Sequence, residues 1–187
     1  LSRKRIKTEK NYQGTLNGIK SLVVEFENEF GLVESVGIGM PGAISVDSSL
    51  VKNANSIWLN GKPIKKDLEN RLDREINLEN DANCFALSEA VDGAGKKYPV
   101  VFGVIIGTGV GGGIIVNKKV LQGINKIGGE WGHIPLPNRT DLEKQHSNKC
   151  YCGLSGCMET YVSGPGFASI FNSINNENLD SHQIIEG

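Results

Sequence analysis

The sequence Gly129-Glu130-Trp131-Gly132-His133, followed after a polar loop by Cys150-Tyr151-Cys152-Gly153-Leu154-Ser155-Gly156-Cys157-Met158-Glu159, dominates the C-terminal half of the chain. It contains three of the four cysteines and one of the three histidines. Zinc prefers four tetrahedral nitrogen and sulfur donors, and glycines between the cysteines allow the chain to fold around one ion. We therefore predict zinc bound by His133, Cys150, Cys152 and Cys157; three buried, unligated thiols are the alternative.

A zinc ion with four protein ligands has no open position for substrate. We therefore expect this zinc to be structural, and to act on chemistry only by holding its loop in place. The second ring nitrogen of His133 then stays available for another contact.

The composition describes an ordinary globular chain. Its 187 residues are enough for one large domain or parts of two, with 39% hydrophobic and 22% charged residues and a net charge of −1. No basic excess indicates a nucleic-acid partner, and the longest apolar runs are far shorter than a membrane span. We expect a cytoplasmic protein without a membrane partner, in which cysteines are thiols or metal ligands rather than disulfides.

Apolar spacing upstream predicts alternating helices and strands. Residues 11–30 fit an amphipathic helix ended by Gly31, and residues 35–40 fit a short buried strand that stops at Pro41-Gly42. A second helix is predicted over residues 63–73. A strand over residues 76–79 then leads into a helical segment.

Asn80 and Asp81 lie at the junction of that strand and helix. Open α/β sheets bind their ligands at such junctions, so Asp81 is a candidate functional carboxylate. Helix capping by the same two residues is the alternative.

The loop over residues 53–61 combines three asparagines with Trp58. Such a loop could line a pocket for a hydroxyl-rich ligand. Its composition favours the other interpretation, a surface loop pinned by its tryptophan.

Residues 100–116 predict two strands joined by a glycine-rich turn. A dinucleotide-binding loop would open a helix, but Ile114-Ile115-Val116 is β-branched, and the Gly-Lys-Ser/Thr of a P-loop is absent. We therefore predict a hairpin whose backbone N–H groups and Thr108 hydroxyl face phosphate oxygens.

Five motifs in matching order resemble the repressor, open reading frame and kinase (ROK) family. They are Gly39-Met40-Pro41-Gly42, Asn80-Asp81-Ala82-Asn83, Gly107-Thr108-Gly109-Val110-Gly111-Gly112-Gly113, Gly129-Glu130-Trp131-Gly132-His133 and the cysteine cluster. Within the family, residues 53–61 and 130–137 resemble the bacterial fructokinases that also accept mannose. Residues 80–89 are similar to N-acetylglucosamine kinase.

The resemblance implies an α/β fold of the actin-like ATPase (ribonuclease H-like) class in two lobes, incomplete at both ends. Residues 1–97 would belong to the N-terminal lobe, and residues 98–187 to the C-terminal lobe with the hairpin and the zinc site. The family's first phosphate-binding segment and its glycine-rich adenosine segment have no counterpart in these residues. We therefore expect the 187 residues alone to be inactive in phosphoryl transfer.

The resemblance also implies ATP-dependent phosphorylation of a hexose, with Mg²⁺ bridging the phosphates. Fructose is the expected sugar, with mannose also accepted, and a homodimer is the expected assembly. Asp81 would be the general base. The implied sugar-binding residues are Asn80, Glu130, His133 and Glu159, and the implied phosphate-binding residues are Gly107, Thr108, Gly109, Gly111 and Gly112.

Two alternatives remain within this resemblance. One is a kinase for N-acetylglucosamine or glucose. The other is a sugar-sensing transcriptional repressor, a class that often loses the Asn-Asp pair or the Gly-Thr-Gly turn. Both motifs are intact here, which favours the kinase.

Overall fold

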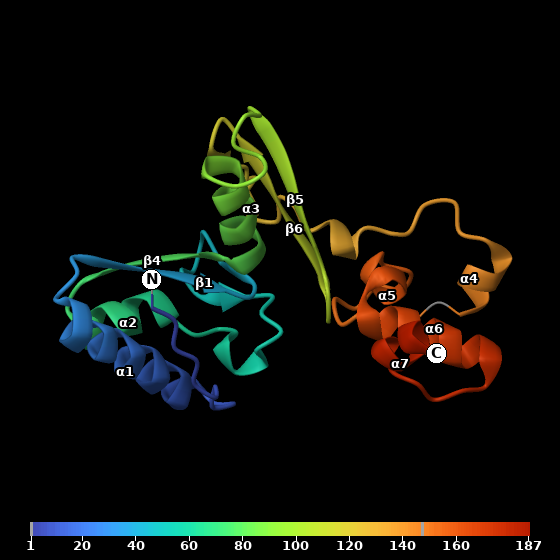
Figure 1. Cartoon of the computed structure of the whole chain (residues 1–187), viewed down its shortest axis with the longest axis horizontal. Helices are drawn as coiled ribbons and strands as arrows, with labels where there is room; N and C mark the ends of the chain where they lie inside the picture. Colours follow the sequence, from blue (N-terminus) through green and yellow to red (C-terminus); the bar gives the residue numbers. More distant parts are fainter. Residues whose placement is uncertain (1, 147) are drawn as a thin grey trace. The chain divides into compact units, whose positions relative to one another are not determined.

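A computed structural model describes residues 2–146 and 148–187 (Figure 1). The chain divides into two compact units, one ending at Asp81 and the other running from Ala82 to Gly187. The assignment of residues 1–97 and 98–187 to two lobes stays a prediction, while this division lies at the start of helix α3 (Asp81–Val91). The reason is packing, because Ala86 of α3 lies against the glycines of the following hairpin.

The first unit is built on two parallel strands, β1 (Ser35–Met40) and β4 (Glu75–Asn80), in a register that places Met40 opposite Asn80. Helices α1 (Tyr12–Phe30) and α2 (Ile64–Leu72) pack together, and α2 also packs on β4 (Figure 1). A small ribbon of β2 (Ala43–Ile44) and β3 (Val51–Lys52) and the 3-10 helix η1 (Ile57–Leu59) complete the unit. Its core includes the fully buried Leu16, Leu68 and Ile76.

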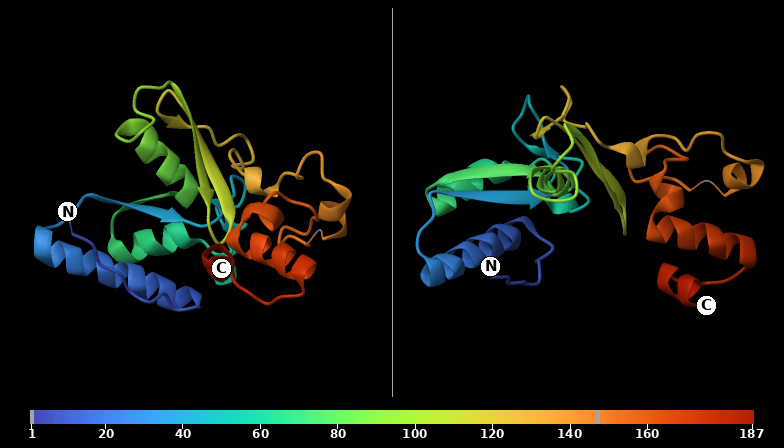
Figure 2. Two further views of the ribbon diagram at one scale, coloured as in Figure 1. Left: turned by 45° about the vertical axis from the view of Figure 1, so that its right-hand side comes forward. Right: turned by 45° about the horizontal axis from the view of Figure 1, so that its top comes forward.

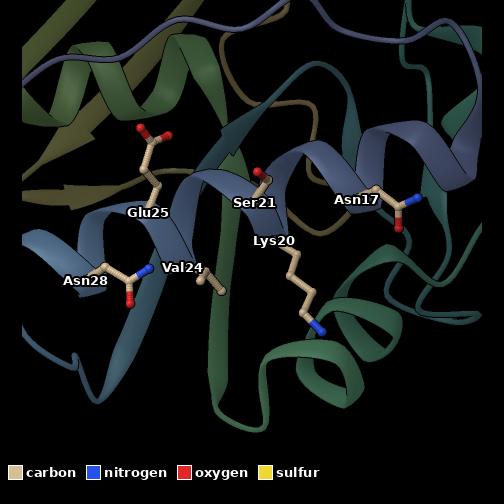
Figure 3. A pocket seen from close by; sticks show the side chains of 6 residues that line it. All are labelled: Asn17, Lys20, Ser21, Val24, Glu25 and Asn28. Carbon is tan, nitrogen blue, oxygen red and sulfur yellow. The ribbon is translucent and has the colours of Figure 1, made fainter.

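Helix α1 begins and ends where the sequence predicts. The Asn11 side chain accepts a hydrogen bond from the Gly14 N–H, and the Gly31 N–H closes the last turn on the Glu27 carbonyl. The exposed face of the helix is polar around Val24 and borders a shallow hollow of about 510 Å³ that is open to solvent (Figure 3). All the side chains that line this hollow come from α1, and none is a predicted site residue.

The loop over residues 53–61 is tied down by its own side chains. The Trp58 indole N–H donates to the Thr15 hydroxyl at 3.0 Å, and Asn60 pairs through both amide atoms with the backbone of Ala54 at 2.9 Å. These contacts support the interpretation of a loop pinned by its tryptophan, because the Trp58 N–H and the Asn60 amide are used within the fold.

The second unit contains a three-stranded antiparallel sheet in the order β5 (Val100–Ile106), β6 (Val110–Val116), β7 (Lys119–Val120). The 3-10 helix η2 (Trp131–His133) and the short helices α4 (Asp141–Gln145) and α5 (Glu159–Val162) follow. Helices α6 (Gly164–Asn175) and α7 (Ser181–Glu186) pack against each other at the C-terminal end (Figure 2).

Glycines in the sheet allow close packing. A Cβ built at Gly103 or Gly113 would lie 2.6 or 2.7 Å from the Ala86 Cβ, so any side chain there would push α3 off the sheet. Among the described helices, none combines the length and the apolar character that a membrane-spanning segment needs.

Candidate metal centre and active site

The structure brings the four predicted metal ligands together. The donor atoms of His133, Cys150, Cys152 and Cys157 all lie within 4.8 Å of one another. The sulfurs of Cys152 and Cys157 are 3.6 Å apart, and His133 Nδ1 is 3.4 Å from the Cys150 sulfur. Zinc–sulfur bonds of about 2.3 Å and zinc–nitrogen bonds of about 2.0 Å at tetrahedral angles need separations of roughly 3.5–3.8 Å. The donor set therefore fits a tetrahedral metal ion.

Two turns shape the cysteine loop. Gly153 and Gly156 have φ values of +91° and +78°, which residues with side chains rarely adopt. The Cys150 N–H donates to the Leu154 carbonyl at 2.8 Å, and Pro135 pairs with Cys157 in an isolated antiparallel bridge. That bridge joins the cysteine loop to the segment that follows His133.

The three thiols differ in acidity. Burial raises the pKa of the Cys150 thiol and raises that of Cys157 to about 12. Burial also acts to raise the pKa of Cys152, but hydrogen bonds from the Leu154 N–H and from the other two thiols lower it overall. In the metal-free chain Cys152 is therefore the most acidic of the three thiols, and metal binding releases the protons that the thiols still carry.

The second nitrogen of His133 has a partner that the sequence interpretation missed. His133 Nε2 lies 2.9 Å from the Tyr151 hydroxyl, and the two rings meet edge to face with centroids 5.0 Å apart. The sequence did contain a signal for this contact, because a tyrosine, which carries a hydroxyl, stands between the ligand cysteines Cys150 and Cys152.

Glu159, the first residue of α5, links the metal cluster to the glycine hairpin. Its Oε2 accepts a hydrogen bond from the Val110 N–H at 2.9 Å, and its Oε1 lies 3.8 Å from the Cys150 sulfur. A Cβ at Gly109 would lie 2.8 Å from Oε2. Gly109 therefore leaves room for this carboxylate.

The five predicted phosphate-binding residues fall into two groups. Gly107, Thr108 and Gly109 form the turn between β5 and β6, where Thr108 is exposed and the Gly107 carbonyl accepts from the Gly164 N–H at 2.8 Å. Gly111 and Gly112 lie within β6 against Trp131, whose indole N–H donates to the Gly111 carbonyl at 2.7 Å. Gly107, Thr108 and Gly109 thus lie in a turn, whereas Gly112 packs closely against Trp131. The phosphate-binding role of all five residues stays a prediction.

A cavity of about 240 Å³ lies between the hairpin turn and the cysteine loop. Its lining includes Thr108, Lys149, Tyr151 and Glu159. It is shallow and open, and its lining combines apolar surface with polar side chains that include a hydroxyl, an ammonium and a carboxylate group. The cavity could therefore take a ligand with several hydrogen-bonding oxygens.

The other predicted site residues lie at the ends of secondary-structure elements. Asn80 ends β4 and donates through its amide to the Gly42 carbonyl at 3.1 Å, and Asp81 is exposed at the first turn of α3. Glu130 precedes η2, and its carbonyl accepts from the His133 N–H at 3.2 Å. Glu130, His133 and Glu159 all belong to the second unit.

Comparison with known proteins gives a match along the chain. A family model described as "ROK family" matches residues 1–187. The N-acetyl-D-glucosamine kinase of Salmonella paratyphi B is 42% identical over 178 residues, which cover 94% of this chain and 59% of that protein. The chain thus spans 59% of the length of this curated relative.

Two solved structures are similar to this fold. The ROK hexokinase from Thermus thermophilus superposes with a TM-score of 0.80 at 27% identity, covering 97% of this chain and 58% of that one. A ROK family glucokinase from Streptomyces griseus, in complex with glucose and AMPPNP, gives a TM-score of 0.74 at 32% identity, with coverages of 91% and 52%.

Proposed function

The chain belongs to the ROK family, and from that premise we propose that it serves the ATP-dependent phosphorylation of a hexose. Its mixed α/β fold is that of the actin-like sugar kinases, as predicted from the sequence. The activity itself is a proposal, because the chain spans only part of the relatives whose names carry it.

The observation that most supports a kinase is the hydrogen bond between Glu159 and the Val110 N–H. Glu159 is an implied sugar-binding residue, and Val110 directly follows the turn implied to bind phosphate. The hydrogen bond therefore brings a carboxylate suited to sugar hydroxyls beside backbone suited to phosphate. A sugar phosphotransferase needs these two functions close together, because phosphoryl transfer depends chiefly on positioning and charge stabilisation.

We assign the chemical step as follows. A sugar hydroxyl oxygen attacks the γ-phosphorus of ATP, the bond to the bridging oxygen of ADP breaks, and Asp81 accepts the hydroxyl proton. Asn80, Glu130, His133 and Glu159 orient the sugar, and carboxylates suit this role because each accepts from two hydroxyls. The Thr108 hydroxyl and the N–H groups of Thr108 and Gly109 hold the phosphates, since the Gly107 N–H donates to the Gly109 carbonyl at 2.9 Å. Mg²⁺ bound with ATP would neutralise charge that develops on the phosphoryl oxygens.

The metal centre has an indirect role in this scheme. Four protein donors leave a zinc ion no open position, so we propose that it is structural. It would fix the cysteine loop relative to His133, and through that loop the start of α5 where Glu159 projects.

N-acetyl-D-glucosamine is our first choice of sugar, and fructose is the second. The 42%-identical relative is named for the amino sugar, and its match covers 94% of this chain. The expectation of fructose rests partly on the loop over residues 53–61. In the structure Trp58 and Asn60 of that loop make hydrogen bonds within the fold, and Trp58 also borders a cavity of about 540 Å³. The loop itself therefore does not distinguish the two sugars.

The test is ADP formation by the protein that contains this chain, measured with N-acetyl-D-glucosamine, fructose, mannose and glucose. We expect the highest kcat/KM for N-acetyl-D-glucosamine. A higher value for fructose would reverse the order of the two sugars. Sugar binding without ADP formation from any of them would favour the repressor alternative. Light scattering on the same sample tests the expected homodimer.

A further inference from the structure

The metal ligands come from two segments of the chain. Three sulfurs are on the loop from Cys150 to Cys157, whereas the nitrogen comes from His133 at the end of η2. A histidine side chain has two rotatable bonds, so its ring needs a further contact to keep one nitrogen directed at the metal. Ligand histidines commonly obtain this contact by donating their other ring N–H to a protein group.

Tyr151 is placed to supply this contact. With Nδ1 of His133 directed at the sulfurs, the neutral ring carries its hydrogen on Nε2, 2.9 Å from the Tyr151 hydroxyl. The tyrosine ring also stands edge to face with the imidazole at an interplanar angle of 88°. Because Tyr151 is itself on the cysteine loop, these contacts join the two ligand-bearing segments.

We propose that Tyr151 is a positioning residue of the metal centre, whose hydroxyl accepts the His133 Nε2–H and holds Nδ1 toward the three sulfurs. It binds no metal itself. The contact lowers the free-energy cost of metal binding, because the His133 ring is already oriented before the ion binds. This role belongs to the sugar-free chain, because a sugar hydroxyl bound to His133 Nε2 would take the place of the Tyr151 hydroxyl. Its tests are made without sugar and measure the metal and the imidazole.

The first test is zinc affinity in Tyr151→Phe, measured by competition with a chromogenic chelator. The change removes only the hydroxyl, and loss of such a partner weakens metal binding by about 10–100-fold. Tyr98→Phe is the matched control, since Tyr98 is 63% exposed, comparable to Tyr151 at 67%, and lies outside the cluster. Unchanged affinity in Tyr151→Phe would overturn the proposal.

A cobalt(II) spectrum and a double-mutant cycle separate positioning from general damage. Tyr151→Phe should keep the tetrahedral cobalt bands, because all four ligands remain. In a His133→Cys background the effect of Tyr151→Phe on affinity should disappear, since no imidazole is left to orient. An effect of the same size in both backgrounds would contradict the proposal.

The unmutated chain gives a readout that does not depend on a variant folding. In ring-nitrogen NMR of the zinc-loaded chain, the His133 Nε2–H should give a resolved signal that exchanges slowly with water. Exchange as fast as that of an exposed imidazole would show that the hydroxyl is not bonded to it.

Discussion

Glu159 shows how one residue can serve two neighbouring parts of the second unit. Its carboxylate accepts from the backbone of the hairpin and lies beside a metal-ligand sulfur. The sequence identifies Glu159 as a candidate through its position after the last cysteine. Its bond to Val110 could not be predicted, because 49 residues separate the two partners.

The same contrast holds for the metal ligands. Their spacing and chemistry are enough to group His133 with the three cysteines, since a loop of eight residues already brings the sulfurs near one another. The contact between Tyr151 and His133 depends instead on the path of the cysteine loop past the end of η2. Sequence spacing does not determine that geometry.

Metal analysis tests the ligand set directly. We expect close to one zinc per chain, and we expect Cys152→Ser to lose it, because a serine hydroxyl is a poor zinc ligand at neutral pH. Cys84→Ser is the control, since Cys84 lies outside the cluster. A fully folded chain that contains no zinc when purified without chelators would contradict the assignment.

Gly109 and Gly107 offer a matched pair for testing the Glu159 contact. A Cβ at Gly109 would lie 2.8 Å from the Glu159 Oε2, whereas a Cβ at Gly107 meets nothing within 4 Å. We expect Gly109→Ala to displace the carboxylate and to speed hydrogen exchange of the Val110 amide by roughly fivefold, because the loss of one hydrogen bond is worth about 1 kcal/mol. Gly107→Ala should leave that exchange unchanged. Equal exchange rates in the two variants would argue against the contact.

At the scale of elements, local patterns predict the positions of α1, β1 and the β5–β6 hairpin well. The expected burial of β1 is wrong, because only Met40 of this strand is buried. Asn11, the apolar spacing and Gly31 all act within α1 itself, and the turn glycines act within the hairpin. The packing role of Gly112 and Gly113 is different, because their neighbours Trp131 and Ala86 are distant in sequence. The sequence interpretation counted Gly112 among the phosphate-binding residues, which stays a prediction, and it could not show the packing of Gly112 and Gly113.

An ion pair connects the end of α1 with the start of β4. The hydrogen bond from Arg74 is the main cause that lowers the pKa of the Glu27 carboxyl, and Arg74 also donates to the Val33 carbonyl at 2.9 Å. A carboxyl whose pKa is lowered by folding stabilises the fold above its unfolded pKa. That stabilisation is lost as the pH falls through the folded pKa.

Urea unfolding of Glu27→Gln between pH 3 and pH 7 tests this pair. The variant should be less stable than the unmutated chain above the ordinary glutamate pKa of about 4.3, and the difference should shrink toward zero as the pH falls below it. Glu34→Gln, at an exposed position before β1, should show no such pH-dependent difference. A constant difference across the whole range would exclude the charge as the cause.

At the scale of the molecule, each unit supplies part of the proposed chemistry. The first carries Asn80 and Asp81 at the end of β4, and the second carries the hairpin turn, the metal cluster and Glu159. The motif order predicts the family and the fold class. The boundary at Asp81 could not be predicted, because it depends on α3 packing against the hairpin rather than on any change in composition.

The most direct test of the kinase proposal is turnover of Asp81→Asn in the protein that contains this chain, with sugar binding measured in parallel. We expect kcat to fall by about 10²–10⁴-fold, the usual contribution of a positioned general base, while sugar affinity and the thermal unfolding midpoint stay near their unmutated values. Asp92→Asn, just beyond the other end of α3, is the control and should keep full activity. Near-normal phosphorylation by Asp81→Asn would contradict the proposed role of Asp81.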